Sequence, residues 1–375
     1  MLAETPPMGF NTWNTFGVNI NDKLIREIAD AMADSGLLEA GYEYLVLDDT
    51  WSEKERDPET DRIIPNREKF PNGMKAVSDY VHSKGLKFGL YSCAGVRTCT
   101  DHPGSFNHEF KDAETFAEYG CDFLKYDFCY KPVIADGPQL YYRMSMALKA
   151  CGREILFSAC NWGADEVNKW IRSSGAHMYR TTGDINDSFE SFKSIALSQL
   201  PALCHSAPGC FNDIDMLTVG MYGKGNVGSV GCNDTEYRTQ FALWCFFSAP
   251  LMIGCDVRSM TPETKALLTN KALISINQDE EARPAFAVGL YPWNEDTKVF
   301  MKHLSGGEYA LGFFNLSERD CSIPAAFWHF GLDAGYGMVL TDCFTGEESG
   351  VIKEYYSPFV AKHDCAVYRA KVVKL

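Results

Sequence analysis

The sequence has no segment long and apolar enough to cross a membrane. No run of apolar residues approaches the roughly 20 that a bilayer-spanning helix needs. The first residues, MLAETPPMGFNTW, also lack the basic start and apolar stretch of a secretory signal peptide. We therefore expect a cytoplasmic protein without a membrane partner, or a secreted one if a leader has been removed from this chain.

An excess of positive charge is missing as well. The 375 residues include 35 Lys and Arg against 50 Asp and Glu, which gives a formal net charge of −15. A surface that binds nucleic acid or an anionic membrane needs the opposite balance. We expect neither as a partner, and solubility explains the acidic surface.

Motifs for metals and nucleotides are absent from the sequence. The 14 cysteines form no CxxC pair, and none is spaced with histidine as in a zinc finger. The first strand-like run is followed by NTFGVNINDK, which has no GxGxxG turn for phosphates. We expect no metal and no cofactor, and we expect most of the cysteines to be free core residues.

Strand-like and helix-like runs alternate over the first three quarters of the chain. Eight runs resemble buried strands, namely residues 8–13, 42–49, 86–92, 123–129, 154–160, 177–184, 210–216 and 250–257. Six amphipathic runs predict helices, namely residues 22–36, 74–85, 110–120, 140–152, 188–200 and 235–247. This alternation indicates an α/β fold, a (β/α)8 TIM barrel at residues 1–284. A doubly wound open sheet is the alternative, but it usually carries the glycine-rich turn that is missing here.

The pattern changes near residue 285. Short strand-like runs follow one another, separated by turn sequences such as SGG and TGEESG, without helical periodicity. The runs are TKVFMKHL, EYALGFFNL, GMVLTDCF and DCAVYRAKVV. We expect a second domain at residues 285–375, a small antiparallel β-sandwich packed against the barrel.

Polar and aromatic residues collect where the predicted strands end, and these ends form the active-site face of a TIM barrel. They are Asn11, Trp13, Asp48, Asp49, Tyr91, Lys125, Asp127, Cys160, Asn161, Trp162, Arg180, Asp184, Asp213, Asp215, Met216 and Asp256. Any one carboxylate could simply cap the next helix. So many together, with tryptophans beside them, indicate a sugar pocket, because carboxylates bind hydroxyls and aromatic faces cover C–H surfaces.

The run FLKYDFC (123–129) places three chemically active side chains on one face of a strand. Alternation directs Lys125, Asp127 and Cys129 into the barrel near its mouth, and the residues between them toward the helices. A nearby ammonium would offset the cost of burying Asp127 and favour its charged form. An ionised carboxylate in a dry pocket can attack an anomeric carbon. The alternative is a purely structural Lys–Asp pair.

The sequence resembles glycoside hydrolase family 27, the α-galactosidases and α-N-acetylgalactosaminidases, over nearly its whole length. The matching motifs occur in the family's order, which makes a chance match improbable. They are TPPMGFNTWNTF, YLVLDDTW, GLYSCAGVRTCTDHPGSF, LKYDFC, FSACNWG, YRTTGDINDSF, FNDIDML, SAPLMIGCDVRSM and INQD. The resemblance implies a hydrolase that removes terminal α-D-galactosyl residues from small-molecule or oligosaccharide α-galactosides with retention of configuration.

The same resemblance implies roles for individual residues. Asp127 would be the nucleophile and Asp184 the acid/base of a double displacement. Lys125 would keep Asp127 ionised, and Asp184 would hold its proton until substrate arrives. The sugar would be bound by Trp13 under its ring, Asp48 and Asp49 at the 4- and 6-hydroxyls, Lys125, Tyr91, Arg180, Asp215, Met216 and Cys99 around it, and Cys160, Asn161 and Trp162 near C2.

The chain departs from the family in its cysteines. The family's LDDCW cysteine is Thr50 here, and its usual partner near residue 18 is also missing. Cys99 and Cys129 match the family's other bridge, beside the active site. The resemblance therefore implies a Cys99–Cys129 disulfide, and two free thiols close together are the alternative.

A third departure concerns the substrate. Many galactosidases of the family have CEW where this chain has Cys160-Asn161-Trp162. Asn161 is shorter than glutamate, but cysteine and tryptophan still crowd C2, which favours galactose. The alternatives are an α-N-acetylgalactosaminidase, a β-L-arabinopyranosidase, and a non-catalytic sugar-binding protein on the same scaffold. The natural leaving group and the oligomeric state, including a homo-oligomer, stay open.

Overall fold

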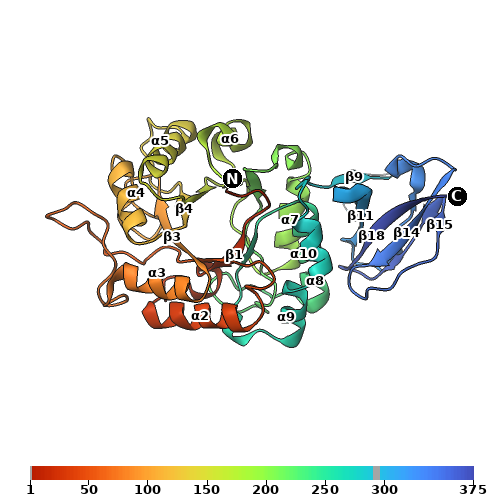
Figure 1. Cartoon of the computed structure of the whole chain (residues 1–375), viewed down its shortest axis with the longest axis horizontal. Helices are drawn as coiled ribbons and strands as arrows, with labels where there is room; N and C mark the ends of the chain where they lie inside the picture. The colour runs from red at the N-terminus through yellow and green to blue at the C-terminus, as the bar shows by residue number, and fades with distance from the viewer. Residues whose placement is uncertain (1, 290–295) are drawn as a thin grey trace.

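The computed structural model describes residues 2–289 and 296–375, and an eight-stranded parallel sheet forms its larger part (Figure 1). The strands are β1 (Met8–Asn11), β2 (Tyr44–Val46), β3 (Lys87–Cys93), β4 (Phe123–Asp127), β5 (Leu156–Cys160), β6 (Met178–Arg180), β7 (Phe211–Asp213) and β8 (Leu251–Ile253). Their order in the sheet is β7-β6-β5-β4-β3-β2-β1-β8, so neighbours in sequence are neighbours in space. Seven of the eight strands lie within the runs that the sequence predicted, and β3 extends one residue beyond its run.

The sheet closes into a barrel between its two edge strands. Leu217, four residues beyond the end of β7, forms a parallel bridge with Ile253 of β8. Its amide donates to the carbonyl of Met252 at 2.8 Å, and its carbonyl accepts from the amide of Gly254 at 3.0 Å. The predicted TIM barrel is confirmed, and the open sheet is excluded by this strand order.

Helices connect the strands and cover the outside of the barrel (Figure 1). They are α1 (Trp13–Phe16), α2 (Asp22–Asp34), α3 (Gly73–Ser83), α4 (Glu109–Glu118), α5 (Gly137–Ala150), α6 (Ile171–Ser174), α7 (Phe189–Ser198), α8 (Asp234–Phe246), α9 (Pro262–Leu268) and α10 (Lys271–Asn277). Side-chain caps start several of them: Asn21 caps α2, Ser188 caps α7, and Asn233 forms a capping box with Glu236 at α8. The six predicted helices are present. The short helices α1, α6, α9 and α10 were not predicted.

The β4 strand shows why the barrel interior is polar at one end. Phe123 packs inside the barrel with a small apolar cluster that includes Tyr44 and Met252, while Leu124 and Tyr126 belong to the outer core beneath the helices. Lys125 and Asp127 follow Phe123 on the inner face at intervals of two residues. The apolar cluster therefore fills the bottom of the barrel, and charged side chains occupy its carboxyl end.

The C-terminal domain is built from antiparallel strands. One sheet has six strands in the order β15-β14-β18-β11-β10-β9, and two short ribbons pair β12 with β17 and β13 with β16. Its strands are β9 (Phe286–Val288), β10 (Thr297–Leu304), β11 (Glu308–Asn315), β12 (Cys321–Ser322), β13 (Ala325–Ala326), β14 (Tyr336–Asp342), β15 (Ile352–Lys353), β16 (Tyr355–Tyr356), β17 (Phe359–Val360) and β18 (Cys365–Lys374). Residues of the sheet and of both ribbons share one apolar core, which confirms the predicted β-sandwich.

The sandwich packs beside α7, α8 and α10 of the barrel (Figure 1). Phe246 of α8 lies 5.7 Å from Phe314 of β11, and Phe247 lies 5.3 Å from Phe300 of β10, measured between ring centroids. The barrel core therefore continues into the sandwich. Within the described residues, no helix is long and apolar enough to span a bilayer.

Candidate active site

A pocket opens at the carboxyl end of the barrel strands, and seven of the eight strands contribute to it. Its lining residues are Trp13, Asn14, Asp48, Asp49, Tyr91, Cys99, Lys125, Asp127, Cys160, Trp162, Arg180, Asp184, Asp215, Met216 and Val227. Every residue that the family resemblance assigned to catalysis or sugar binding is in this set except Asn161, while Asn11, Asp213 and Asp256, also expected at this face, do not line the pocket. The structure thus brings together side chains that lie up to about 200 residues apart in sequence, as the barrel topology predicts.

Asp127 ends β4 and lies at the floor of the pocket, only 7% exposed. One of its carboxylate oxygens accepts from the Tyr91 hydroxyl at 2.9 Å, and the other accepts from the amide of Phe128 at 2.9 Å. Burial raises the pKa of Asp127 to about 6, although the nearby charge of Lys125 opposes the rise. Two hydrogen bonds therefore fix the carboxylate while leaving it facing the pocket.

Lys125 connects β4, the strand that carries Asp127, to the carboxylates that follow β2. Its ammonium donates to Asp48 at 2.8 Å, and the same Asp48 oxygen accepts from Asn11 at 2.7 Å. Burial by itself would lower the pKa of Lys125, but Asp48 holds it above its usual value. The predicted ion pair of Lys125 is thus made with Asp48 rather than with Asp127, which keeps an acceptor free at the pocket floor.

Asp49 is held at the pocket wall by backbone donors. Its carboxylate accepts from the amide of Thr50 at 2.7 Å and from the amide of Thr100 at 3.2 Å. The ring of His102 lies 3.8 Å away. Asp48 and Asp49 are both buried, so each presents a fixed oxygen to the pocket.

Asp184 differs from Asp127 in its exposure, since 73% of its side chain is open to solvent. One Arg180 nitrogen lies 2.9 Å from Asp184 and also 2.9 Å from Asp215. Asp215 in turn accepts from the amides of Ile185 and Met216 at 2.8 and 2.7 Å. Arg180 therefore connects Asp184 to a rigidly held carboxylate from the strand-seven loop.

The two carboxyls do not titrate as the sequence led us to expect. Desolvation by itself would raise the pKa of Asp184, but the charges of Arg180 and Lys125 lower it below its usual value. Of the two carboxyls, Asp127 therefore has the higher pKa and Asp184 the lower. The sequence could not show this order, because it depends on Arg180 reaching Asp184.

The wall expected near C2 consists of Cys160 and Trp162 but not Asn161. Asn161 is fully buried and donates to the carbonyl of Ala164 at 2.9 Å, so its side chain points away from the pocket. The Cys160 sulfur lies 3.9 Å from Arg180, and Trp162 lines the pocket while 39% exposed. The shorter residue at position 161 therefore adds no room beside the sugar.

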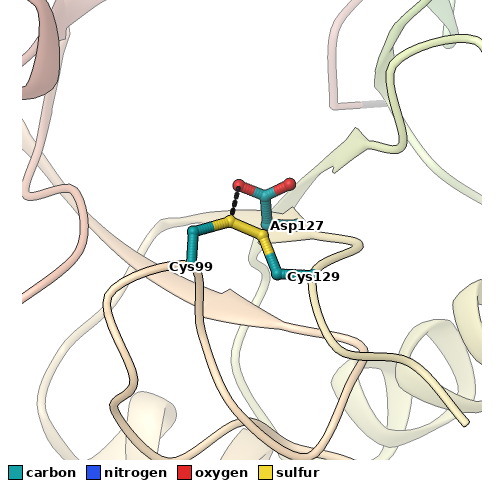
Figure 2. A group of neighbouring side chains, drawn as sticks. All are labelled: Cys99, Asp127 and Cys129. Carbon is teal, nitrogen blue, oxygen red and sulfur yellow. Dashed lines mark hydrogen bonds between the residues drawn. A yellow bond between two sulfur atoms is a disulfide. The ribbon is translucent and has the colours of Figure 1, made fainter.

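Cys99 and Cys129 are joined by a disulfide at the edge of the pocket (Figure 2). Their Cα atoms are 5.4 Å apart, and the Cys99 sulfur lies 3.8 Å from a carboxylate oxygen of Asp127. Together with Asp127 they are also the group of possible metal ligands found among residues 2–289 and 296–375. Sulfurs joined in a disulfide have no thiolate to offer a metal, so the predicted bridge excludes that use in the oxidised protein.

Some of the strained backbone positions of the described residues lie at or next to the pocket. Four residues without glycine's freedom adopt a positive φ there: Thr50 at 73°, Tyr130 at 48°, Trp162 at 57° and Asp215 at 81°. Such conformations persist only where surrounding contacts enforce them, and they are typical of functional sites.

Sequence reasoning missed two lining residues. Asn14 and Val227 border the pocket, and the amide of Val227 donates to the carbonyl of Asn14 at 3.0 Å. Asn14 directly follows Trp13, so its position could have been predicted. Val227 belongs to the glycine-rich loop after β7, and its place depends on how that loop folds back over the first strand.

The TIM barrel carries two carboxyls of unlike environment on one pocket, and further carboxylates and tryptophans surround them. This combination of fold and site defines a glycoside hydrolase. The chain belongs to the alpha-galactosidase family. The family model for alpha galactosidase A matches residues 5–279, and the model for the alpha galactosidase C-terminal beta sandwich domain matches residues 294–370.

Similar proteins support the same placement. Alpha-galactosidase 3 of Arabidopsis thaliana is 40% identical over 374 residues, which cover 98% of this chain and 82% of the plant protein. The crystal structure of alpha-galactosidase I from Mortierella vinacea is 31% identical, with a TM-score of 0.91, and covers 98% of this chain and 97% of its own. The structure of α-galactosidase from Saccharomyces cerevisiae with raffinose is 25% identical, with a TM-score of 0.89, and covers 99% and 98%.

Proposed function

We propose that this protein hydrolyses terminal α-D-galactosyl residues with retention of anomeric configuration. The observation that carries the proposal is the convergence of Asp127 and Asp184 on one pocket, the first buried and fixed, the second exposed beside Arg180. Relatives about 40% identical that are named α-galactosidases support the substrate. A protein that only bound sugar would not need both carboxyls.

The reaction proceeds in two displacements. Asp184 gives its proton to the glycosidic oxygen while a carboxylate oxygen of Asp127 attacks C1, so the bond to the leaving group breaks as the glycosyl–aspartate ester forms. Asp184, now a carboxylate, then takes a proton from water, whose oxygen attacks C1 and releases Asp127. Two inversions at C1 restore the original configuration.

In the first displacement Asp184 must carry a proton and Asp127 must not, and the bound substrate favours this arrangement. Arg180 by itself favours the charged form of Asp184, because it lowers the pKa of that carboxyl. A sugar and its leaving group would cover the exposed carboxyl of Asp184, and desolvation raises the pKa of an acid. At the same time Tyr91 and the Phe128 amide both donate to Asp127 and favour its charged form. Substrate binding thus moves the proton toward the residue that must donate it.

The pocket wall favours galactose over N-acetylgalactosamine. Cys160 and Trp162 occupy the wall near Arg180, and the small Asn161 does not open it. The fixed oxygens of Asp48 and Asp49 would bind the 4- and 6-hydroxyls, which selects an axial 4-hydroxyl and a sugar that has C6. These contacts count against both the α-N-acetylgalactosaminidase and the β-L-arabinopyranosidase alternatives.

Parallel assays test the proposal. The 4-nitrophenyl glycosides of α-D-galactose, α-D-N-acetylgalactosamine and β-L-arabinopyranose are compared by kcat/KM, with Asp127→Asn as the inactive control. We expect the galactoside to be preferred by at least about tenfold, since one good contact discriminates by 1–3 kcal/mol. A preference for either other sugar would reject the assignment of substrate, and no hydrolysis of any would reject the enzyme.

A further inference from the structure

Asp213, the last residue of β7, is a buried carboxylate below the sugar pocket that the two-displacement mechanism does not use. It is 6% exposed and does not line the pocket. The sheet register makes Asp127, Cys160, Arg180 and Asp213 consecutive partners on the neighbouring strands β4 to β7. Asp213 therefore lies beside Arg180 in the same row of side chains that carries Asp127.

A second cavity, of about 30 Å³, lies directly beneath the pocket. The two share Lys125, Cys160, Arg180, Asp215 and Met216. The cavity adds Asn11, Phe123, Ser158, Met178, Asp213 and Met252. Its upper wall is thus polar and its floor apolar. A volume of this size with several polar partners is sufficient for an ordered water molecule.

One wall of this cavity carries an unsatisfied donor. The Nε of Arg180 is buried and has no hydrogen-bond partner among the residues that the structure describes, although one terminal nitrogen of the same guanidinium contacts Thr182, Asp184 and Asp215. A buried donor without a partner costs roughly 1–3 kcal/mol, so such groups are normally paired with protein or water. The amide of Asp215 donates to one oxygen of Asp213 at 2.9 Å, which fixes the carboxylate at this wall.

We propose that Asp213 is a positioning residue for the catalytic pair: through water in the lower cavity it anchors Lys125 and Arg180 from below, and so controls how the proton is divided between Asp127 and Asp184. Lys125 lowers the pKa of Asp127, the nucleophile, and Arg180 pairs with Asp184, the acid. Asp213 is a buried carboxylate that lines the cavity together with both cations. The inference rests on the function proposed above.

The charges around Asp213 agree with this role. The groups that face it are Arg180 from β6, Lys125 from β4, the Cys160 thiol from β5 and Asp215 from its own loop. Burial raises the pKa of Asp213 to about 6, Arg180 and Lys125 oppose the rise, and Asp215 adds to it. Asp213 therefore gains its charge in the pH range where Asp127 also does.

The test is the pH dependence of kcat/KM for an aryl α-galactoside, compared between the wild type, Asp213→Asn and the matched control Asp256→Asn. Asp256 lies three residues beyond β8, lines neither cavity, and pairs with Arg258 at 2.7 Å. Removing the charge of Asp213 leaves Lys125 and Arg180 less neutralised, which lowers the pKa of both catalytic carboxyls. We expect the alkaline limb of the profile to move down by about half to one pH unit, which lowers kcat/KM at pH 7 by about three- to tenfold. Asp256→Asn should leave the profile unchanged.

A purely structural role would lower the unfolding temperature and scale the profile without moving it, and that result would overturn the inference. If Asp213→Asn does not fold, the pH profile of Asp213→Ser and a high-resolution crystal structure of the wild type test the inference in its place. A crystal structure without a water bound to Asp213 and to Lys125 or Arg180 would likewise overturn it. A wild type inactive on every α-galactoside would instead reject the proposed function, so the two failures are distinguishable.

Discussion

Asp127 and Asp184, the proposed nucleophile and acid, are the same residue type in different surroundings. Asp127 is buried and receives hydrogen bonds from Tyr91 and a backbone amide. Asp184 is exposed and pairs with Arg180. The residue types and their positions at strand ends could be predicted from the sequence. The order of their pKa values could not, because it follows from distances that only the folded barrel sets.

The pH profile is the first prediction at this scale. The active form has one proton on the pair, and it is most populated between the two pKa values, one near 6 and one below the usual range of an aspartate. We expect kcat/KM to be bell-shaped, with its maximum on the acid side of pH 6 and a decline above it. Rate measurements from pH 3 to 9 on one galactoside check this. A maximum near pH 8 would show that the pair titrates otherwise.

Loss of the acid is the second prediction. Asp184→Ala removes the proton donor but leaves the nucleophile, so the damage should depend on the leaving group. We expect a loss of about 10²–10⁴-fold for a galactoside with a poor leaving group and a much smaller loss for a dinitrophenyl galactoside. Steady-state rates on both substrates measure the difference. Equal losses on the two would remove Asp184 from the role of acid.

At the scale of elements, two loops of the barrel mouth are held in different ways. In place of the family's missing disulfide, Thr50 donates to the carbonyl of Val18 at 3.2 Å, and Lys69 binds that carbonyl at 2.8 Å and the Thr50 hydroxyl at 2.9 Å. The replacement could not be predicted, because Lys69 is distant in sequence from both partners.

The prediction at the scale of elements concerns the contribution of the Cys99–Cys129 disulfide to stability. It closes a loop across 30 residues, which contributes about 3–4 kcal/mol to the free energy of unfolding in the chain-entropy account. We expect the double variant Cys99→Ser, Cys129→Ser to unfold at a lower denaturant concentration, and a dithiol reductant to bring the wild type to the same midpoint. The double variant itself is the control, since reductant should leave it unchanged. A wild type insensitive to reductant would mean that the two cysteines are free thiols.

Over the whole molecule, the two domains share an interface rather than a flexible tether. Arg238 of α8 forms a two-point ion pair with Asp364, which precedes β18, and His363 stacks on Phe189 of α7 at 3.6 Å between ring centroids. Lys302 of β10 is fully buried, and burial lowers its pKa to about 7 while it donates to the carbonyl of Cys245 at 3.1 Å. The sequence predicted the two folds and their packing together, but not these particular contacts, because they join residues that are 57 or more positions apart.

Cooperative unfolding is the prediction for the whole chain. Because the core of the barrel continues into the sandwich, we expect calorimetry to show one transition for the full-length protein. Asp364→Asn leaves Arg238 partly buried without its partner and should lower the transition temperature of both domains together. The exposed pair of Lys75 and Asp79 gives the matched control, Asp79→Asn, which should have little effect. Two separate transitions in the wild type would show that the domains are independent.

The attack of Asp127 on the anomeric carbon is the claim on which the account of this enzyme rests. A fluorinated α-galactosyl fluoride, whose ring fluorine slows hydrolysis of the glycosyl ester more than its formation, allows the intermediate to accumulate. Mass spectrometry of the digested protein then locates the sugar. We predict one galactosyl group per chain, attached to Asp127. A label on any other residue would contradict this assignment.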